Sequence, residues 1–186
     1  NAPVNALTGY TESLNPPKYR LVVGGEFTSA GGLAANSVAL WTESDVIQQT
    51  GWSPMGAGFN GPVMALARHS GRIVAGGIFT QSGVDSRRYV ARWDGTAWQA
   101  MGTGMNNSVF ALKSYQVTPI SNALVAGGGF TRANGNSANF IAVWVTTENV
   151  PEGGWNPLGA GFNNTVYAIE RFGGSRLARC ATGKAA

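Results

Sequence analysis

Short apolar segments separated by glycine-rich or polar turns follow one another along the whole chain. Segments such as VMALARH at 63–69 and VYAIERF at 166–172 partly alternate apolar and polar residues and are rich in β-branched and aromatic side chains. That pattern is typical of β-strands with one buried face. Segments such as IVAGGIFT at 73–80 are almost continuously apolar, which predicts strands buried on both faces. We expect an all-β protein.

The same segments recur in a fixed order, so the chain contains an internal repeat. Each unit has a valine-led strand, a strand with a glycine doublet, and two segments that each carry a tryptophan. The doublets begin at Gly24, Gly76 and Gly127. The sequence therefore predicts units of four strands at 1–58, 59–104 and 105–161, and the start of a fourth unit at 162–172.

The tryptophans and the length differences give the layout of a unit. All six tryptophans occupy equivalent positions, which indicates packing inside the repeat rather than an exposed sugar platform. Asp94-Gly95 predicts a tight turn between the strands of Trp93 and Trp98. Length varies only between the paired tryptophans and between the valine-led and doublet strands, which identifies those two connections as surface loops.

The repeat breaks in residues 173–186. Arg176, Arg179 and the only cysteine, Cys180, stand where another apolar doublet strand is expected. Two interpretations are open, a C-terminal tail or an early end in an altered reading frame, and we favour the second. Since the chain begins at Asn1 with neither Met nor a signal-peptide profile, we also expect that it was either trimmed or cut from a longer chain.

A glycine doublet closing a strand, then an aromatic-Asp turn and a tryptophan a few residues later, resembles a kelch-type repeat. The fuller string GGxFTxAGG…AxxVAxWxGxxWxxMGxGxNxxVxAL is similar to repeats in large secreted bacterial proteins and in fungal cortical polarity markers. The resemblance covers residues 1–172 and implies a β-propeller of four-stranded blades at an extracellular or cell-surface location. Because propeller blades carry many functions, it implies no particular activity. The FT after the doublet and the MGxGxN closure depart from the ordinary kelch pattern.

About three and a half blades do not close a ring, since propellers typically have about 4–8 blades. Two interpretations are open. Either a parent chain of about 300–350 residues forms six or seven blades, which we favour, or copies of this chain complete a ring as a homo-oligomer.

Composition and charge exclude some classes of function. The charged residues make up 12% of the chain, the net charge is +4, and no five like charges are consecutive, so we expect a solvated surface and no nucleic-acid partner. No apolar run approaches the roughly 18 residues of a membrane span, and we expect no transmembrane segment.

The residues that could carry chemistry are few. His69 is the only histidine, and we interpret it as a surface residue. Kelch-like blades of the galactose-oxidase type hold copper through histidines and a Tyr–Cys pair, which one His and one Cys do not provide, so we expect no cofactor. A calcium site using Asp85 or Asp94 stays open as a minor alternative. We expect no catalytic residue and no metal site.

Two features stand out as candidate binding or modification sites. Arg87 and Arg88 break the repeat, because units one and three have Ala34-Ala35 and Ser137-Ala138 there. Asn106 and Asn163 begin glycosylation sequons in equivalent loops, which matter only in a eukaryotic secretory context.

These observations predict a non-catalytic binding or scaffold module that recognises protein or glycan through loops at one rim of a propeller. One alternative is a structural repeat protein that assembles through its blade edges. The other is a hydrolase or lyase with acids at the ring centre, for which only Glu26 is suitably placed.

Overall fold

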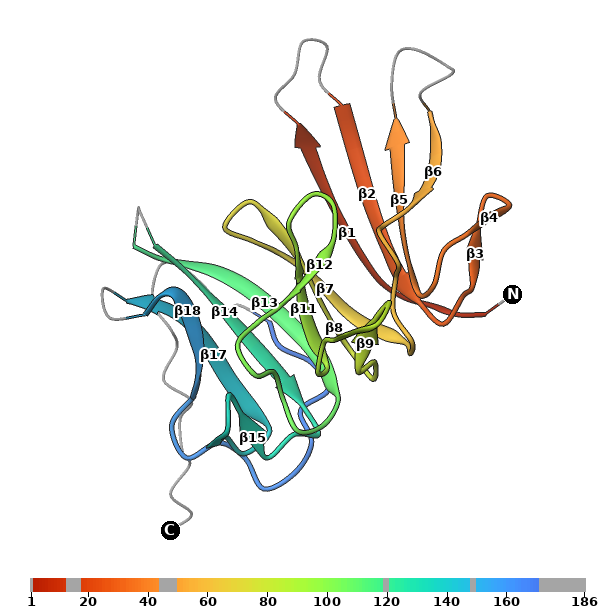
Figure 1. Ribbon diagram of the computed structural model, residues 1–186. Coiled ribbons are helices and arrows are strands. Elements are labelled where there is room, and N and C mark those ends of the chain that lie inside the picture. Colours follow the sequence, from red (N-terminus) through yellow and green to blue (C-terminus); the bar gives the residue numbers. More distant parts are fainter. Residues whose placement is uncertain (1, 13–17, 44–49, 119–120, 148–149, 171–186) are drawn as a thin grey trace.

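The computed structural model describes residues 2–12, 18–43, 50–118, 121–147 and 150–170. These residues form β-strands and no helix, so the prediction of an all-β protein is confirmed. Three four-stranded antiparallel sheets follow one another along the chain and lie side by side (Figure 1). No closed ring is formed by the part of the chain that the structure describes, and the arrangement is compatible with propeller blades.

Each sheet takes its strands from one repeat unit. Sheet 1 contains, in spatial order, β1 (Val4–Glu12), β2 (Lys18–Gly25), β5 (Val38–Glu43) and β6 (Gly51–Pro54). Sheet 2 contains β7 (Val63–His69), β8 (Arg72–Gly77), β11 (Val90–Trp93) and β12 (Trp98–Ala100). Sheet 3 contains β13 (Val109–Thr118), β14 (Ser121–Gly128), β17 (Ile141–Thr147) and β18 (Val150–Pro157).

A small two-stranded hairpin follows the doublet strand in every unit. The hairpins are β3 (Ser29–Ala30) with β4 (Leu33–Ala34), β9 (Gln81–Ser82) with β10 (Asp85–Ser86), and β15 (Arg132–Ala133) with β16 (Asn136–Ser137). The repeat pattern did not predict them, because their strands are two residues long and their glycine-rich, polar sequences are typical of loops.

The glycine doublets allow neighbouring sheets to approach closely. A Cβ atom added at Gly24 would lie 2.4 Å from Cγ1 of Val63, and one added at Gly76 would lie 2.5 Å from Cγ1 of Val109. Each valine belongs to the first strand of the next sheet. The valine side chain therefore fills the space that a side chain at the glycine would need, as expected for glycine where a neighbouring element comes close.

Two apolar clusters fill the spaces between the sheets. The cluster between sheets 1 and 2 includes Val22, Met55, Phe79 and Trp98, and it stacks Phe59 on Phe79 with ring centroids 3.9 Å apart. The cluster between sheets 2 and 3 is larger and includes Trp144 and Trp155. The prediction that doublet strands are buried on both faces is confirmed, since β8 is buried from Ile73 to Gly77.

The paired tryptophans face each other across adjacent strands in all three sheets. Their ring centroids lie 5.3 to 5.4 Å apart in the pairs Trp41–Trp52, Trp93–Trp98 and Trp144–Trp155. The predicted hairpin at Asp94 is confirmed, because β11 pairs with β12 and Trp93 lies opposite Trp98. The tryptophans therefore pack within the repeat, as their equivalent positions indicated.

His69 is buried rather than exposed, which corrects the interpretation from sequence. Only 6% of its surface is exposed, and its Nδ1 lies 3.0 Å from Oγ of Ser114 in sheet 3. Burial lowers the pKa of the imidazole, and the positive charge of Arg92 lowers it further. The alternation of β7 places position 69 on the same buried side as Ala65 and Ala67, which pack toward sheet 3, a period that the sequence already contained.

We expect the stability of the protein to fall as the pH drops below about 6.5, the usual pKa of histidine. The folded state holds His69 neutral, so the unfolded state binds the proton more readily and is favoured as the pH falls. His69→Gln should show no such loss of stability between pH 7.5 and the lower pH at which the carboxylates begin to titrate, because the chain has no second histidine. Urea midpoints measured across this pH range test the prediction, and equal slopes for both proteins would contradict it.

The two variable loops of the repeat lie partly outside the described residues. Residues 173–186 lie entirely outside them. Residues 162–170 form no strand, but they lie along sheet 3, where the amide of Val166 donates to the carbonyl oxygen of Gly128 at 3.2 Å. Among the described residues there is no helix long and apolar enough to cross a bilayer.

Candidate functional site

The small hairpins and the loops after the last strands gather at one end of the three sheets, which we call the hairpin rim (Figure 1). Asparagines anchor this rim. Oδ1 of Asn60 accepts hydrogen bonds from the backbone amides of Thr80 and Gln81 at 2.8 and 2.9 Å. Oδ1 of Asn106 accepts the equivalent pair from Thr131 and Arg132, both at 2.9 Å. Each loop therefore holds the hairpin of the next sheet in place.

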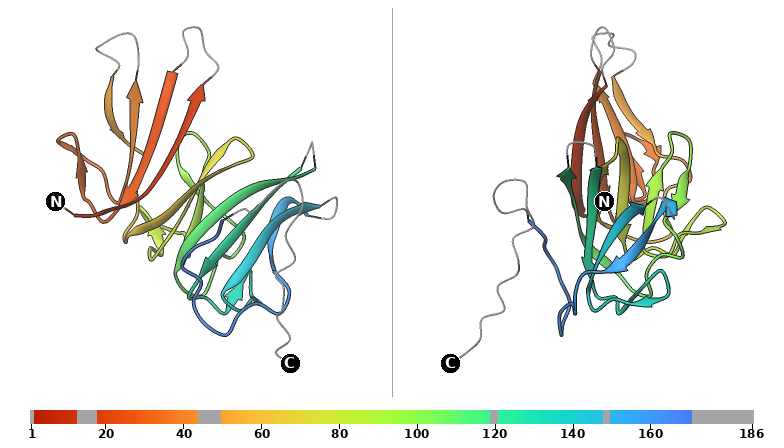
Figure 2. Two further views of the ribbon diagram at one scale, coloured as in Figure 1. Left: turned by 180° about the vertical axis from the view of Figure 1, so that it is seen from behind. Right: turned by 90° about the vertical axis from the view of Figure 1, so that its left-hand side faces the viewer.

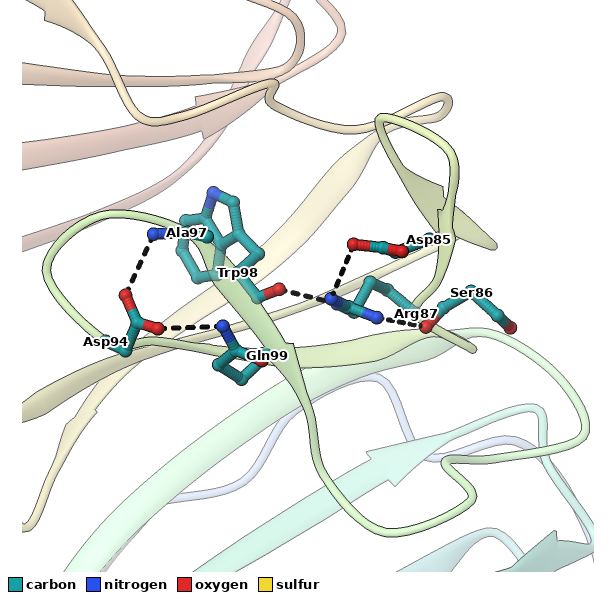
Figure 3. Close-up of polar contacts among 7 residues, drawn as sticks. All are labelled: Asp85, Ser86, Arg87, Asp94, Ala97, Trp98 and Gln99. Carbon is teal, nitrogen blue, oxygen red and sulfur yellow. Dashed lines mark hydrogen bonds and ion pairs between the residues drawn. The ribbon is translucent and has the colours of Figure 1, made fainter.

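Arg87 and Arg88, the candidate binding pair, have different environments. Arg87 is folded against its own sheet, where Nε donates to the carbonyl oxygen of Trp98 at 2.5 Å and a terminal nitrogen donates to that of Ser86 at 2.7 Å (Figure 3). A second terminal nitrogen lies 3.2 Å from Oδ2 of Asp85, and the Arg87 side chain is only 12% exposed. These contacts tie the hairpin β9–β10 to the edge strand β12, so Arg87 is a structural residue.

Arg88 is exposed and lines two adjoining depressions on the hairpin rim. One depression, of about 300 Å³, is also lined by Val90, Ala100 and the loop 101–104. The other, of about 350 Å³, is also lined by Thr80, Gln81 and Asn106. Ser86 and Arg88 belong to both. The guanidinium of Arg88 makes no ion pair with the described residues, so its five donors can meet a ligand.

The hydrogen bonds of the hairpins correct the alignment of this pair by one residue. The equivalent donor–acceptor pairs are Ala35 N–Thr28 O, Arg87 N–Thr80 O and Ala138 N–Thr131 O, at 2.7 to 2.9 Å. Arg87 therefore corresponds to the buried Ala35 and Ala138, and Arg88 corresponds to Asn36 and Asn139. Sequence comparison missed the shift because the hairpins were not recognised as elements.

The corrected alignment shows what Arg88 replaces. Nδ2 of Asn36 donates to the carbonyl oxygen of Ala57 at 3.2 Å, and Nδ2 of Asn139 donates to that of Ala160 at 3.0 Å. Both bonds close the loop after the last strand of the sheet. In sheet 2 the equivalent loop residue is Thr103. Its amide donates instead to Oδ1 of Asn134 in the hairpin of sheet 3, at 3.0 Å. Sheet 2 therefore presents an arginine where the other two sheets have an internal loop bond.

Arg88→Asn should be neutral for folding or stabilise it by about 0.5–1.5 kcal/mol, the usual net value of a hydrogen bond. The new asparagine has the same backbone setting as Asn36 and Asn139 and can donate to the carbonyl oxygen of Thr103. Arg87→Ala should instead destabilise, because it removes the bonds to Trp98 and Ser86. Denaturant unfolding of the two variants tests this contrast, which fails if Arg88→Asn proves the more harmful.

The two acids considered for calcium are engaged in local contacts. Oδ1 of Asp94 accepts from the amide of Ala97 at 2.8 Å, and Oδ2 accepts from Gln99 at 2.7 Å (Figure 3). Oδ1 also accepts from the amide of Thr96 at 2.8 Å. These bonds, the backbone ones most strongly, hold the pKa of Asp94 well below its usual range. Asp85 pairs with Arg87. In the described part of the chain no three His, Cys, Asp or Glu side chains are grouped so as to hold a metal ion.

The remaining candidates lie at the same rim. Nδ2 of Asn106, the atom a glycan would occupy, donates to Oγ1 of Thr131 at 3.0 Å, and the non-sequon Asn60 makes the same bond to Thr80. Asn163 occupies the equivalent position before Val166 and is exposed. Glu26 is exposed just beyond the end of β2. Glycosylation of Asn106 and Asn163 stays a prediction.

Comparison with known protein families finds no matching family model, and comparison with curated proteins and with solved structures finds no significant match. The likeness to kelch-type repeats therefore stays an interpretation of the residues quoted above.

Proposed function

We propose that this chain contributes kelch-like blades to a β-propeller that acts as a non-catalytic binding module of an extracellular or cell-surface protein. Its ligand, carried by a protein or a glycan, is an anionic group that binds at the hairpin rim beside Arg88. The repeat motifs support the blade architecture and the location. The three antiparallel sheets are compatible with this architecture.

One observation carries the assignment of the site. Arg88 is an exposed cation shared by two depressions, at a position where the other two sheets have an asparagine bound to its own loop. Guanidinium groups bind carboxylate, sulfate and phosphate through paired hydrogen bonds. The surrounding rim is held by the asparagine anchors, so a ligand would meet a preorganised surface, which lowers the entropic cost of binding.

Arg132 adds a second positive charge near this place. It is exposed in the hairpin of sheet 3, and its carbonyl oxygen accepts from the amide of Asn106, which lines one of the depressions. Two cations on one rim favour an acidic partner and raise its rate of association at low salt.

The test is a binding screen of wild-type protein and Arg88→Asn against sulfated and uronate-containing glycans and against acidic peptides. We expect wild-type binding that weakens with salt and a loss of about tenfold or more in Arg88→Asn, since a charged hydrogen bond is worth about 1.5–3 kcal/mol. Asn36→Arg, which adds an arginine at the equivalent position of sheet 1, is the matched control and should not change binding at sheet 2. Equal binding by wild type and Arg88→Asn would refute the proposal.

A further inference from the structure

Sheet 1 has an apolar face that no other sheet of the described residues covers. Its buried cluster is formed by Val23, Phe27, Ala35 and Ala39, with Leu21, Ala30 and Trp52 packed against it. In sheet 2 the equivalent residues Ile73, Ala75, Phe79, Ala91 and Trp98 belong to the cluster that sheet 1 covers. The face that sheets 2 and 3 each present to the preceding sheet is therefore present in sheet 1 without a partner.

The first strand shows most clearly what this face lacks. Val4 is 54% exposed, whereas its equivalents Val63 and Val109 are completely buried against the glycine of the preceding sheet. Leu7 is 61% exposed, whereas its equivalent Leu112 is 8% exposed. The strand register is the same in each case, because Val4 pairs with Gly25 as Val63 pairs with Gly77. Two large apolar side chains project from β1 in the positions that elsewhere insert into a neighbour.

The matching surface lies at the other end of the chain, on the outer face of sheet 3. Gly127 stands there as Gly24 and Gly76 do in their sheets. A Cβ atom added at Gly127 would lie 2.6 Å from Cγ1 of Val166 and 3.0 Å from Cδ1 of Ile169. For Gly76 the corresponding neighbours are Val109 and Leu112. Residues 166–170 thus lie where the first strand of a following sheet would pack, a position on sheet 3 that we call the seat. They form no strand themselves.

This seat is incompletely covered by the chain's own segment. Phe162 is 46% exposed, whereas its equivalents Phe59 and Met105 are 4% and 2% exposed under a complete sheet. The contacts of the segment include the ring of Tyr167 on that of Phe110 at 5.2 Å and the pair Lys113–Glu170 at 2.7 Å. A four-stranded sheet would bury more apolar surface there than this segment does.

We propose that the free face of sheet 1 docks on the outer face of sheet 3 of a second copy of this chain, where β1 takes the seat of residues 166–170. The contact repeats the two interfaces within the chain, with Val4 and Leu7 against Gly127 as Val63 and Leu66 lie against Gly24. Because its two sides differ, the contact is head-to-tail, and it closes a ring only if the rotation between copies allows it. Arg88 takes no part in it.

The first experiment measures self-association by sedimentation velocity from low to high micromolar concentration. We expect the wild type to associate and Leu7→Glu to remain monomeric, since the glutamate would be buried without a partner. Val84→Glu is the matched control, because Val84 is 95% exposed on the hairpin β9–β10 and lies outside the interface. Arg88→Asn should associate like the wild type, which separates this inference from the proposed ligand site.

A second variant tests the role of the chain's own segment. Deletion of residues 163–186 frees the seat, so association should tighten. If the segment holds the seat for about nine-tenths of the time, the dissociation constant should fall about tenfold. Monomeric behaviour of both the wild type and this deletion at every concentration would overturn the proposal, as would association that Leu7→Glu leaves unchanged.

A disulfide gives a direct test of the geometry. Asn5 contacts Met64 of the next first strand, with Nδ2 3.4 Å from Sδ. At the equivalent positions Phe110 contacts Tyr167, with ring centroids 5.2 Å apart. In a Cys180→Ser background, Asn5→Cys with Phe110→Cys should form a linked dimer on oxidation. The control pair Asn5→Cys with Val84→Cys should not. Equal linking of both pairs would contradict the predicted interface.

Discussion

Gly77→Ala is expected to destabilise the protein by about 3 kcal/mol or more, the range of the most disruptive single substitutions. The added Cβ atom would lie 2.1 Å from the carbonyl oxygen of Pro62 and 3.0 Å from the ring of Phe79. The oxygen belongs to the backbone and accepts the amide hydrogen bond of Ile78, so it cannot move away without breaking that bond. The equivalent Gly25 and Gly128 are as close to the carbonyl oxygens of Pro3 and Ser108, at 2.2 and 2.0 Å.

The neighbouring Gly76 provides the control, because its close neighbour is a side chain. Gly76→Ala should cost about 1–3 kcal/mol, as overpacking of a core does, and Val109→Ala should relieve part of this cost in the double variant. Val109→Ala should give Gly77→Ala no such relief. Urea unfolding of the single and double variants measures the coupling. A rescue of Gly77→Ala by Val109→Ala would show that the two glycines do not have these separate roles.

Trp98→Phe should lower the free energy of unfolding by about 2–3 kcal/mol, and Trp155→Phe should lower it clearly less. Both tryptophans are 1% exposed at equivalent positions in neighbouring sheets. Nε1 of Trp98 donates to the carbonyl oxygen of Met55 at 3.0 Å, across the interface between sheets 1 and 2. Without this bond the carbonyl oxygen of Met55 keeps only the bond from the amide of Gly58 at 3.2 Å. The lost hydrogen bond costs about 0.5–1.5 kcal/mol, which adds to the loss of ring volume.

Trp155 shares the size and burial of Trp98 but lacks this bond, since its buried Nε1 has no hydrogen-bond partner among the described residues. The loss of ring volume is therefore common to both variants, and their difference isolates the hydrogen bond. Chemical unfolding followed by circular dichroism avoids reliance on tryptophan fluorescence, which both variants change. Equal losses for the two variants would mean that packing alone accounts for the effect.

The regular part of the fold could be predicted from the sequence because it repeats. Glycine doublets and paired tryptophans recur in the same order. In a repeated β-sheet unit the glycines allow the next sheet to come close, and the tryptophans pack across adjacent strands. The environment of His69 was predicted wrongly because the sequence was considered one strand at a time. Strand alternation puts position 69 on the same side as Ala65 and Ala67. That side is covered by the next sheet, where Ser114 contacts His69, and alternation within one strand does not show that neighbour.

The candidate site was predicted only in part for a similar reason. Arg87 and Arg88 were recognised as residues that break the repeat, but adjacent arginines look alike in a sequence. Their difference depends on which of them faces the edge strand β12, and that is decided by the hairpin β9–β10. Two-residue strands are too short to give a periodic signal, so neither the one-residue shift nor the separate roles could be read beforehand.

The three sheets follow one another in a row (Figure 2). The two faces of each sheet have a consequence for how the chain could change in length. Each sheet has a valine on one face and a glycine on the other. The two junctions between sheets therefore have the same contact, in which the valine of one sheet packs against the glycine of the sheet before it. A duplicated copy of residues 59–104, inserted between two units, would present the same valine and the same glycine to its new neighbours. Insertion of a whole unit therefore keeps the valine–glycine contact at each junction, whereas insertion of half a unit would leave a valine or a glycine without its partner.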